Sequence, residues 1–87
     1  MLPYYQKGVS KMSPEEIRRM IGRNIMNLRS EYGISRKSLA KLIKIPVNQL
    51  RRVESGDVNA KLFDVHLKRI GMVFGITVDQ LYDGIPD

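Results

Sequence analysis

Apolar residues in this 87-residue chain recur at spacings of three and four, which is the period of an α-helix that buries one face. One such stripe runs from Ile17 to Leu28, and a second runs from Phe63 to Phe74. No stretch alternates between apolar and polar residues for long enough to predict a β-strand. The second stripe consists of Phe63, Leu67, Ile70 and Phe74. The sequence therefore predicts an all-α fold, a compact bundle of five helices.

Residues with strong preferences for helix ends mark where these helices begin and end. Ser13, Pro14 and Glu16 form the signature of a capping box at the start of the first helix, which is expected to end at Gly33. Ser35 is expected to cap a short second helix. The remaining boundaries are predicted at Pro46 and Gly56 for the third helix, Gly75 for the end of the fourth, and Thr77 with Gln80 as the capping box of the fifth.

The two short helices in the middle of the chain have one apolar and one polar face. In the second helix, Leu39, Leu42 and Ile43 are expected to face inward. A helix turns by about 100° per residue, so Leu50 and Val53 of the third helix point one way, and the polar residues Asn48, Arg51 and Arg52 point the other way, with Val47 at the edge. Only about four residues connect these helices, which predicts that they meet at a steep angle and leave the third helix protruding.

Positive charge is concentrated on the same segment. The chain has 15 Lys and Arg residues against nine Asp and Glu, a formal net charge of +6 and a pI near 9.9. The stretch from Arg36 to Arg52 holds no acidic residue, whereas the C-terminal end is acidic. Such an excess indicates an anionic partner, although a charged stretch can also be a solvated helix face.

Several function classes are disfavoured by what the sequence lacks. Without cysteine and with a single histidine, His66, neither a disulfide framework nor a cysteine-based zinc site can be built, and we expect no metal and no cofactor. No Gly-rich phosphate loop or nucleophile motif points to an enzyme. No apolar run approaches the roughly 20 residues that cross a membrane, and no signal peptide is visible, so a cytoplasmic location is expected.

Two segments carry a resemblance to a known family. Residues 35–40, SRKSLA, and residues 45–56, IPVNQLRRVESG, resemble the helix-turn-helix of the lambda repressor and Cro type, the XRE family, over roughly residues 21–84. Two departures stand in the turn: Lys44 replaces the usual glycine, and Pro46 replaces the usual Ser or Thr. The resemblance implies a lambda-repressor-like fold over residues 13–87 and a sequence-specific transcriptional regulator, typically a repressor, that binds double-stranded DNA as a homodimer.

The same resemblance, together with side-chain chemistry, assigns roles to individual residues. Arg can bond guanine, Asn or Gln can bond adenine, and Val can contact a thymine methyl group. Arg29 and Glu54 are expected to form a structural ion pair. The expected base contacts are Val47, Asn48, Gln49, Arg51 and Arg52, and the expected phosphate contacts are Arg36, Lys37, Lys44 and Lys61.

Two further hypotheses concern the ends of the chain. Residues 1–12 are interpreted as a flexible N-terminal arm, in which Tyr4 and Tyr5 could pack on a protein partner. This leaves open an alternative function as a protein-interaction module, such as the antitoxin of a toxin-antitoxin pair. The segment from Val78 to Ile85 is the expected dimer surface.

Overall fold

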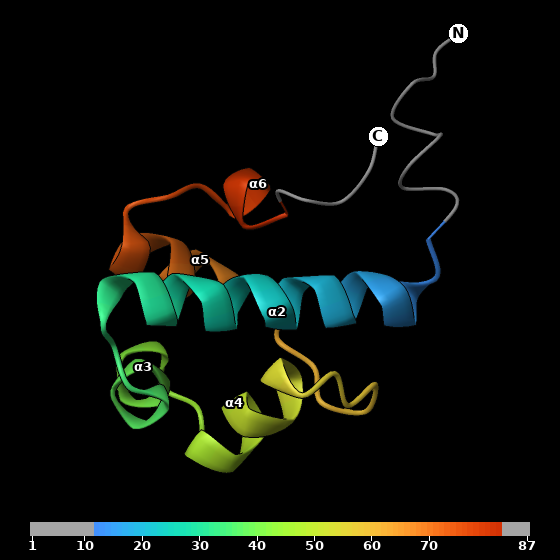
Figure 1. Ribbon diagram of the computed structural model, residues 1–87, viewed down its shortest axis with the longest axis horizontal. Helices are drawn as coiled ribbons and strands as arrows, with labels where there is room; N and C mark the ends of the chain where they lie inside the picture. Colours follow the sequence, from blue (N-terminus) through green and yellow to red (C-terminus); the bar gives the residue numbers. More distant parts are fainter. Residues whose placement is uncertain (1–11, 83–87) are drawn as a thin grey trace, which may run out of the picture.

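The longest helix, α2, lies across the middle of the molecule in the computed structural model, which describes residues 12–82 (Figure 1). Two short helices, α3 and α4, lie below it in this view, α6 lies above it and α5 lies behind. The described residues contain five helices and no strand, which confirms the predicted all-α bundle. The helices are α2 (Pro14–Tyr32), α3 (Arg36–Ile43), α4 (Val47–Glu54), α5 (Asp64–Phe74) and α6 (Val78–Leu81).

The predicted caps account for the helix boundaries. At the start of α2 the Ser13 hydroxyl accepts the backbone N–H of Glu16 at 3.1 Å, and the Glu16 carboxylate accepts the N–H of Ser13 at 2.9 Å. The Ser13 N–H also lowers the pKa of Glu16, because it stabilises the charged carboxylate. Gly33 ends the helix in the left-handed conformation, with φ 66°. Ser35 and Thr77 cap α3 and α6 as expected.

The core draws side chains from all five helices. Six of the largest side chains are completely buried, and at least one comes from each helix: Ile25, Leu39, Ile43, Leu50, Ile70 and Leu81. Burying an aliphatic side chain of this size stabilises the folded state by about 1.5–3 kcal/mol. Because each helix supplies at least one, the core fixes α3 and α4 against α2 and α5.

Two residues expected in the core lie on the surface. Leu42 is 55% exposed, because α3 buries the sector defined by Leu39, Ala40 and Ile43, and Leu42 falls outside it. Phe63 is 67% exposed, because α5 begins only at Asp64. Phe63 is the N-cap residue, with an extended backbone, so the helical period does not extend to it. None of the helices formed by residues 12–82 combines the length and hydropathy needed to cross a bilayer.

Candidate nucleic-acid interface

A three-residue turn, Lys44 to Pro46, joins α3 to α4. Lys44 adopts the left-handed conformation, φ 63° and ψ 49°, which is the conformation that favours glycine. The N–H of Ile45 donates to the carbonyl of Ala40 at 3.0 Å, which closes the end of α3. In Figure 1 α3 is seen nearly along its axis while α4 runs obliquely across the view, so the two helices are not antiparallel.

The inner face of α4 is held by burial. Leu50 is fully buried and Val53 is 6% exposed, whereas Asn48, Arg51 and Arg52 are exposed. This division is the one that the helical period predicts. One side of α4 therefore packs on the core, and the other side is free to meet a partner.

Gly22 of α2 sets how closely α4 approaches, which the sequence interpretation did not identify. A Cβ atom at Gly22 would lie 2.1 Å from the carbonyl oxygen of Val53, far inside the 3.0 Å below which Cβ atoms essentially never approach another heavy atom. The backbone of α4 therefore rests directly on the backbone of α2. The only sequence signal is a glycine inside an otherwise regular helical stripe, which often marks a packing requirement.

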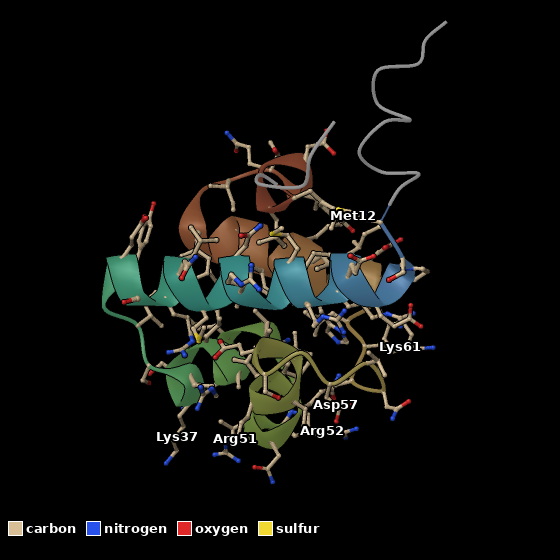
Figure 2. All side chains as sticks on the ribbon, turned by 45° about the vertical axis from the view of Figure 1, so that its right-hand side comes forward. Met12, Lys37, Arg51, Arg52, Asp57 and Lys61 are labelled. Atoms are coloured by element: carbon tan, nitrogen blue, oxygen red, sulfur yellow. The ribbon has the colours of Figure 1, made fainter. Side chains whose placement is uncertain are left out.

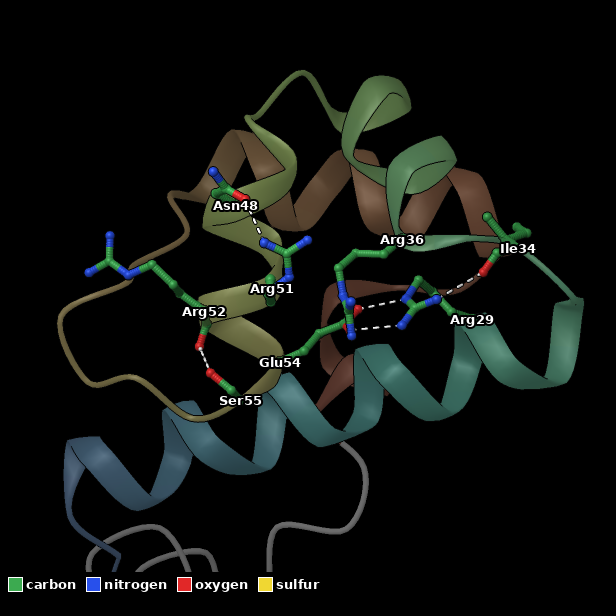
Figure 3. A network of polar contacts seen from close by, with 8 residues as sticks. All are labelled: Arg29, Ile34, Arg36, Asn48, Arg51, Arg52, Glu54 and Ser55. Carbon is green, nitrogen blue, oxygen red and sulfur yellow. Dashed lines mark hydrogen bonds and ion pairs between the residues drawn. The ribbon is translucent and has the colours of Figure 1, made fainter.

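A buried carboxylate ties α4 to both neighbouring helices (Figure 3). The predicted ion pair is present: Arg29 donates from Nε to Oε2 of Glu54 at 2.7 Å and from Nη2 to Oε1 at 2.8 Å. The Glu54 side chain is 1% exposed. The hydrogen bond to Glu54 raises the pKa of Arg29 above its ordinary value. Arg29 also donates to the carbonyl of Ile34 at 3.1 Å, which holds the segment between α2 and α3.

Arg36 has a role that the sequence interpretation did not anticipate. Its Nε donates to Oε1 of Glu54 at 2.9 Å, so it is the second arginine of the buried ion pair. Its side chain stays 33% exposed. A phosphate contact by Arg36 stays a prediction, but the residue also joins α3 to α4.

Cations flank the exposed face of α4. In Figure 2 Lys37 lies to one side of Arg51 and Arg52, and Lys61 lies to the other side. Lys37, Lys44 and Lys61 are all exposed. The structure thus brings two of the predicted phosphate contacts, Lys37 and Lys61, to the same side of the molecule as Arg51 and Arg52.

Four of the five predicted base contacts, all except Val47, make side-chain hydrogen bonds within the protein. The Asn48 side-chain oxygen accepts a bond from Nη1 of Arg51 at 2.6 Å. Gln49 donates from Nε2 to the carbonyl of Lys61 at 2.8 Å, which ties α4 to the following loop. Bonding adenine uses both the oxygen and the nitrogen of the amide. The bonded Asn48 oxygen keeps a second lone pair and the bonded Gln49 nitrogen keeps a second N–H. Val47 is half-buried at the edge of the exposed face.

The end of α4 places an acidic residue beside Arg52. Gly56, with φ 84°, reverses the chain, and the N–H of Asp57 donates to the carbonyl of Arg52 at 3.0 Å. This backbone bond is typical of a Schellman motif. The two side chains also meet, since Arg52 Nε donates to Oδ2 of Asp57 at 2.8 Å. The bond from Arg52 lowers the pKa of Asp57, and the N–H of Asn59 lowers it further.

The expected dimer surface, Val78 to Ile85, stays a prediction, but one of its residues does not face outward. Leu81, at its centre, is fully buried in the core of the same chain, and its carbonyl accepts a hydrogen bond from Asn24 Nδ2 at 2.9 Å. It therefore cannot contact a second copy. Val78 and Tyr82 are half-buried. Ile85, like Tyr4 and Tyr5 of the arm, lies outside the described residues.

In the described part of the chain, no group of three His, Cys, Asp or Glu side chains is placed to hold a metal ion. His66 accepts the N–H of Phe63 through Nδ1 at 3.1 Å, which is a capping role at the start of α5. Comparison with known proteins gives no family: no model of a protein family matches the chain, and no curated protein does. The interpretation of this surface therefore depends on its geometry and chemistry.

Proposed function

We propose that this protein is a sequence-specific regulator of transcription that binds double-stranded DNA with α4 in the major groove, as a homodimer. The observation that carries the proposal is the exposed face of α4. Asn48, Arg51 and Arg52 point away from a helix whose opposite face is anchored by Leu50 and Val53. A protruding helix with donor and acceptor side chains is the element that reads base edges in the major groove.

The surrounding charge supports the same proposal. Phosphate contacts supply most of the affinity of such proteins and position the reading helix. Lys37 and Lys61 lie on the two sides of the exposed arginines, where the sugar-phosphate backbones on either side of a groove would run (Figure 2). Lys44, in the turn before α4, adds a third exposed cation.

The rigidity of α4 supports it as well. A reading helix has to hold its side chains in a defined register with respect to the base pairs. Glu54 joins α4 to α2 through Arg29 and to α3 through Arg36. Gly22 adds direct backbone contact between α2 and α4.

Selection of bound duplexes from a random pool, followed by fluorescence anisotropy over a range of salt concentrations, tests the proposal. We expect a defined motif with two related half-sites about 34 Å apart and an affinity that falls steeply with salt. If no duplex is retained even at low salt, the proposal is wrong. Salt-independent binding to a protein would then support the protein-interaction alternative.

Three variants separate the proposed roles. Arg52→Ala is expected to flatten the sequence preference and cost about 1–3 kcal/mol on the selected duplex. Lys37→Ala is expected to weaken selected and random duplexes alike and to reduce the salt slope by about one. Lys68→Ala is the control, because it removes the same charge from α5, beside Gly71 and Thr77 and away from α4. Identical behaviour of the Arg52 and Lys37 variants would contradict this division of roles.

A further inference from the structure

The bond between Arg52 and Asp57 uses a particular nitrogen of the arginine. Asp57 accepts from Nε, the nitrogen nearest the backbone, at 2.8 Å. The bond to Asp57 therefore does not use the two parallel N–H groups at the end of the guanidinium, one on Nη1 and one on Nη2. These are the groups with which an arginine bonds O6 and N7 of guanine at the same time.

The carboxylate that holds Arg52 is itself fixed. Its second oxygen, Oδ1, accepts the backbone N–H of Asn59 at 2.9 Å. The backbone N–H of Asp57 donates to the carbonyl of Arg52, so the turn at Gly56 brings the side chains of Arg52 and Asp57 together. Arg52 nevertheless stays 52% exposed. An exposed arginine normally samples many rotamers, and this arrangement restricts it before any DNA is bound.

Taking the proposed function as its basis, we infer that Asp57 is a positioning residue that aims Arg52 at a guanine in the major groove, so that the bound sequence carries a G·C pair opposite Arg52. In this arrangement α4 selects guanine, and the selection depends on a residue outside α4.

Charge favours a base edge over a phosphate as the target of Arg52. A phosphate bound by Arg52 would lie close to the carboxylate of Asp57, and the two anions would repel each other. The guanine edge carries no net charge and presents two acceptors. An aspartate beside Arg52 therefore weakens a phosphate contact and is compatible with guanine recognition.

Arg51 provides an internal comparison. It is adjacent in sequence and also exposed, but it donates from a terminal nitrogen, Nη1, and its partner is the neutral amide of Asn48 on the same helix. In Arg51, one of the two terminal nitrogens that would bond guanine is therefore already engaged with Asn48. We assign the guanine contact to Arg52 on this difference.

The test measures base preference at one position. The selected duplex is synthesised with each of the four base pairs at every position, and the position that loses its preference in Arg52→Ala is identified. For the wild-type protein we expect guanine there, preferred by about tenfold or more. In Asp57→Ala the preference is expected to fall to about threefold or less, while the affinity for random duplex DNA stays the same or rises, because a negative charge facing the phosphates is removed.

Two further variants make the result specific. Asp57→Asn keeps an oxygen acceptor for Nε and should retain more of the guanine preference than Asp57→Ala. Glu31→Ala removes an exposed carboxylate from α2, outside the expected dimer surface, and should keep the full preference. Circular dichroism and thermal unfolding report whether each variant folds. If Asp57→Ala does not fold, the guanine preference of Asp57→Asn tests the inference.

Four outcomes would overturn the inference. These are an unchanged guanine preference in the Asp57 variants, a preference for another base at the position of Arg52, an equal loss of affinity for all duplexes in folded Asp57→Ala, and an equal loss of preference in Glu31→Ala. Each of them leaves the proposed function intact, since the wild-type protein still selects a duplex. A wild-type protein that retains no duplex would instead contradict the proposed function itself.

Discussion

Arg29 of α2 and Glu54 of α4 meet through two hydrogen bonds, 2.7 and 2.8 Å long, that use both oxygens of the carboxylate. Arg36 adds a third bond at 2.9 Å from the start of α3. Glu54 follows Arg51 and Arg52 by only three and two residues. Any tilt of α4 that moved these arginines would also break the bonds to Glu54, so the ion pair fixes the direction in which α4 presents its exposed face.

Glu54→Ala is expected to lower the free energy of unfolding by about 3–5 kcal/mol, because it leaves two arginines without their buried partner. Arg29, with a side chain only 14% exposed, is the more affected. Urea unfolding followed by circular dichroism measures the loss. Glu31→Ala is the control, since Glu31 is an exposed acid on α2 and its removal should change the stability by less than about 0.5 kcal/mol. A loss below about 1 kcal/mol for Glu54→Ala would show that the ion pair is not important for stability.

Gly22→Ala is expected to destabilise the protein by about 1–3 kcal/mol, the usual cost of overpacking. Helix propensity alone predicts the opposite, a gain of about 1 kcal/mol. The contact with the Val53 carbonyl decides the sign, because the added Cβ meets backbone that cannot rotate away. Thermal unfolding checks the result against Ser30→Ala at an exposed site on the same helix. A Gly22→Ala protein more stable than the wild type would refute the close contact between α2 and α4.

The helix boundaries were predictable from the sequence because their causes are local. The capping box of Ser13 and Glu16 and the end of α2 at Gly33 involve residues a few positions apart, whose preferences do not depend on the rest of the fold. The exposed and buried faces of α4 follow from the helical period for the same reason. The Arg29–Glu54 ion pair came from the family resemblance, since no local rule connects two residues 25 positions apart.

The expectations that proved wrong, and the contacts that the sequence did not predict, depend on how the helices pack against one another. Leu42 lies at the edge of an apolar sector, and only the placement of α3 against α5 determines that it is exposed. The roles of Gly22 and Arg36 depend on how α2, α3 and α4 approach one another. The partnership of Asp57 with Arg52 required the exact course of the chain after Gly56, although a glycine followed by an acidic residue at the end of an arginine-rich helix is a usable signal.

Lys44→Gly is expected to raise the free energy of unfolding by about 1 kcal/mol, because glycine adopts the left-handed conformation of this turn without steric cost. Under the proposed function, the same change should weaken binding to all duplexes and reduce the salt slope by about one, since it removes a phosphate contact. Unfolding by urea and anisotropy titrations at several salt concentrations measure the two effects.

Lys41→Gly and Lys44→Asn are the controls for this prediction. Lys41 lies inside α3, where glycine should destabilise by about 1 kcal/mol. Lys44→Asn removes the charge but keeps a residue that tolerates the left-handed conformation. It should therefore lose DNA affinity with little change in stability. Equal stability changes in Lys44→Gly and Lys41→Gly would contradict the strain assigned to the turn.

The stability conferred by Asp57 is expected to depend on pH in a defined direction. The bond from Arg52 holds the pKa of Asp57 below its ordinary value of 3.8 in the folded state. The carboxylate therefore stabilises the folded state at every pH above that ordinary value, and this contribution is lost as the pH falls through the lowered pKa. Asp57→Asn should accordingly lower the Tm at pH 7, and the difference from the wild type should disappear in strongly acidic solution. Asp79→Asn, which removes a charge far from Arg52, controls for the overall change in net charge. A difference in Tm between Asp57→Asn and the wild type that persists unchanged into strong acid would contradict the Arg52–Asp57 bond, because a protonated aspartate offers Arg52 no charged partner.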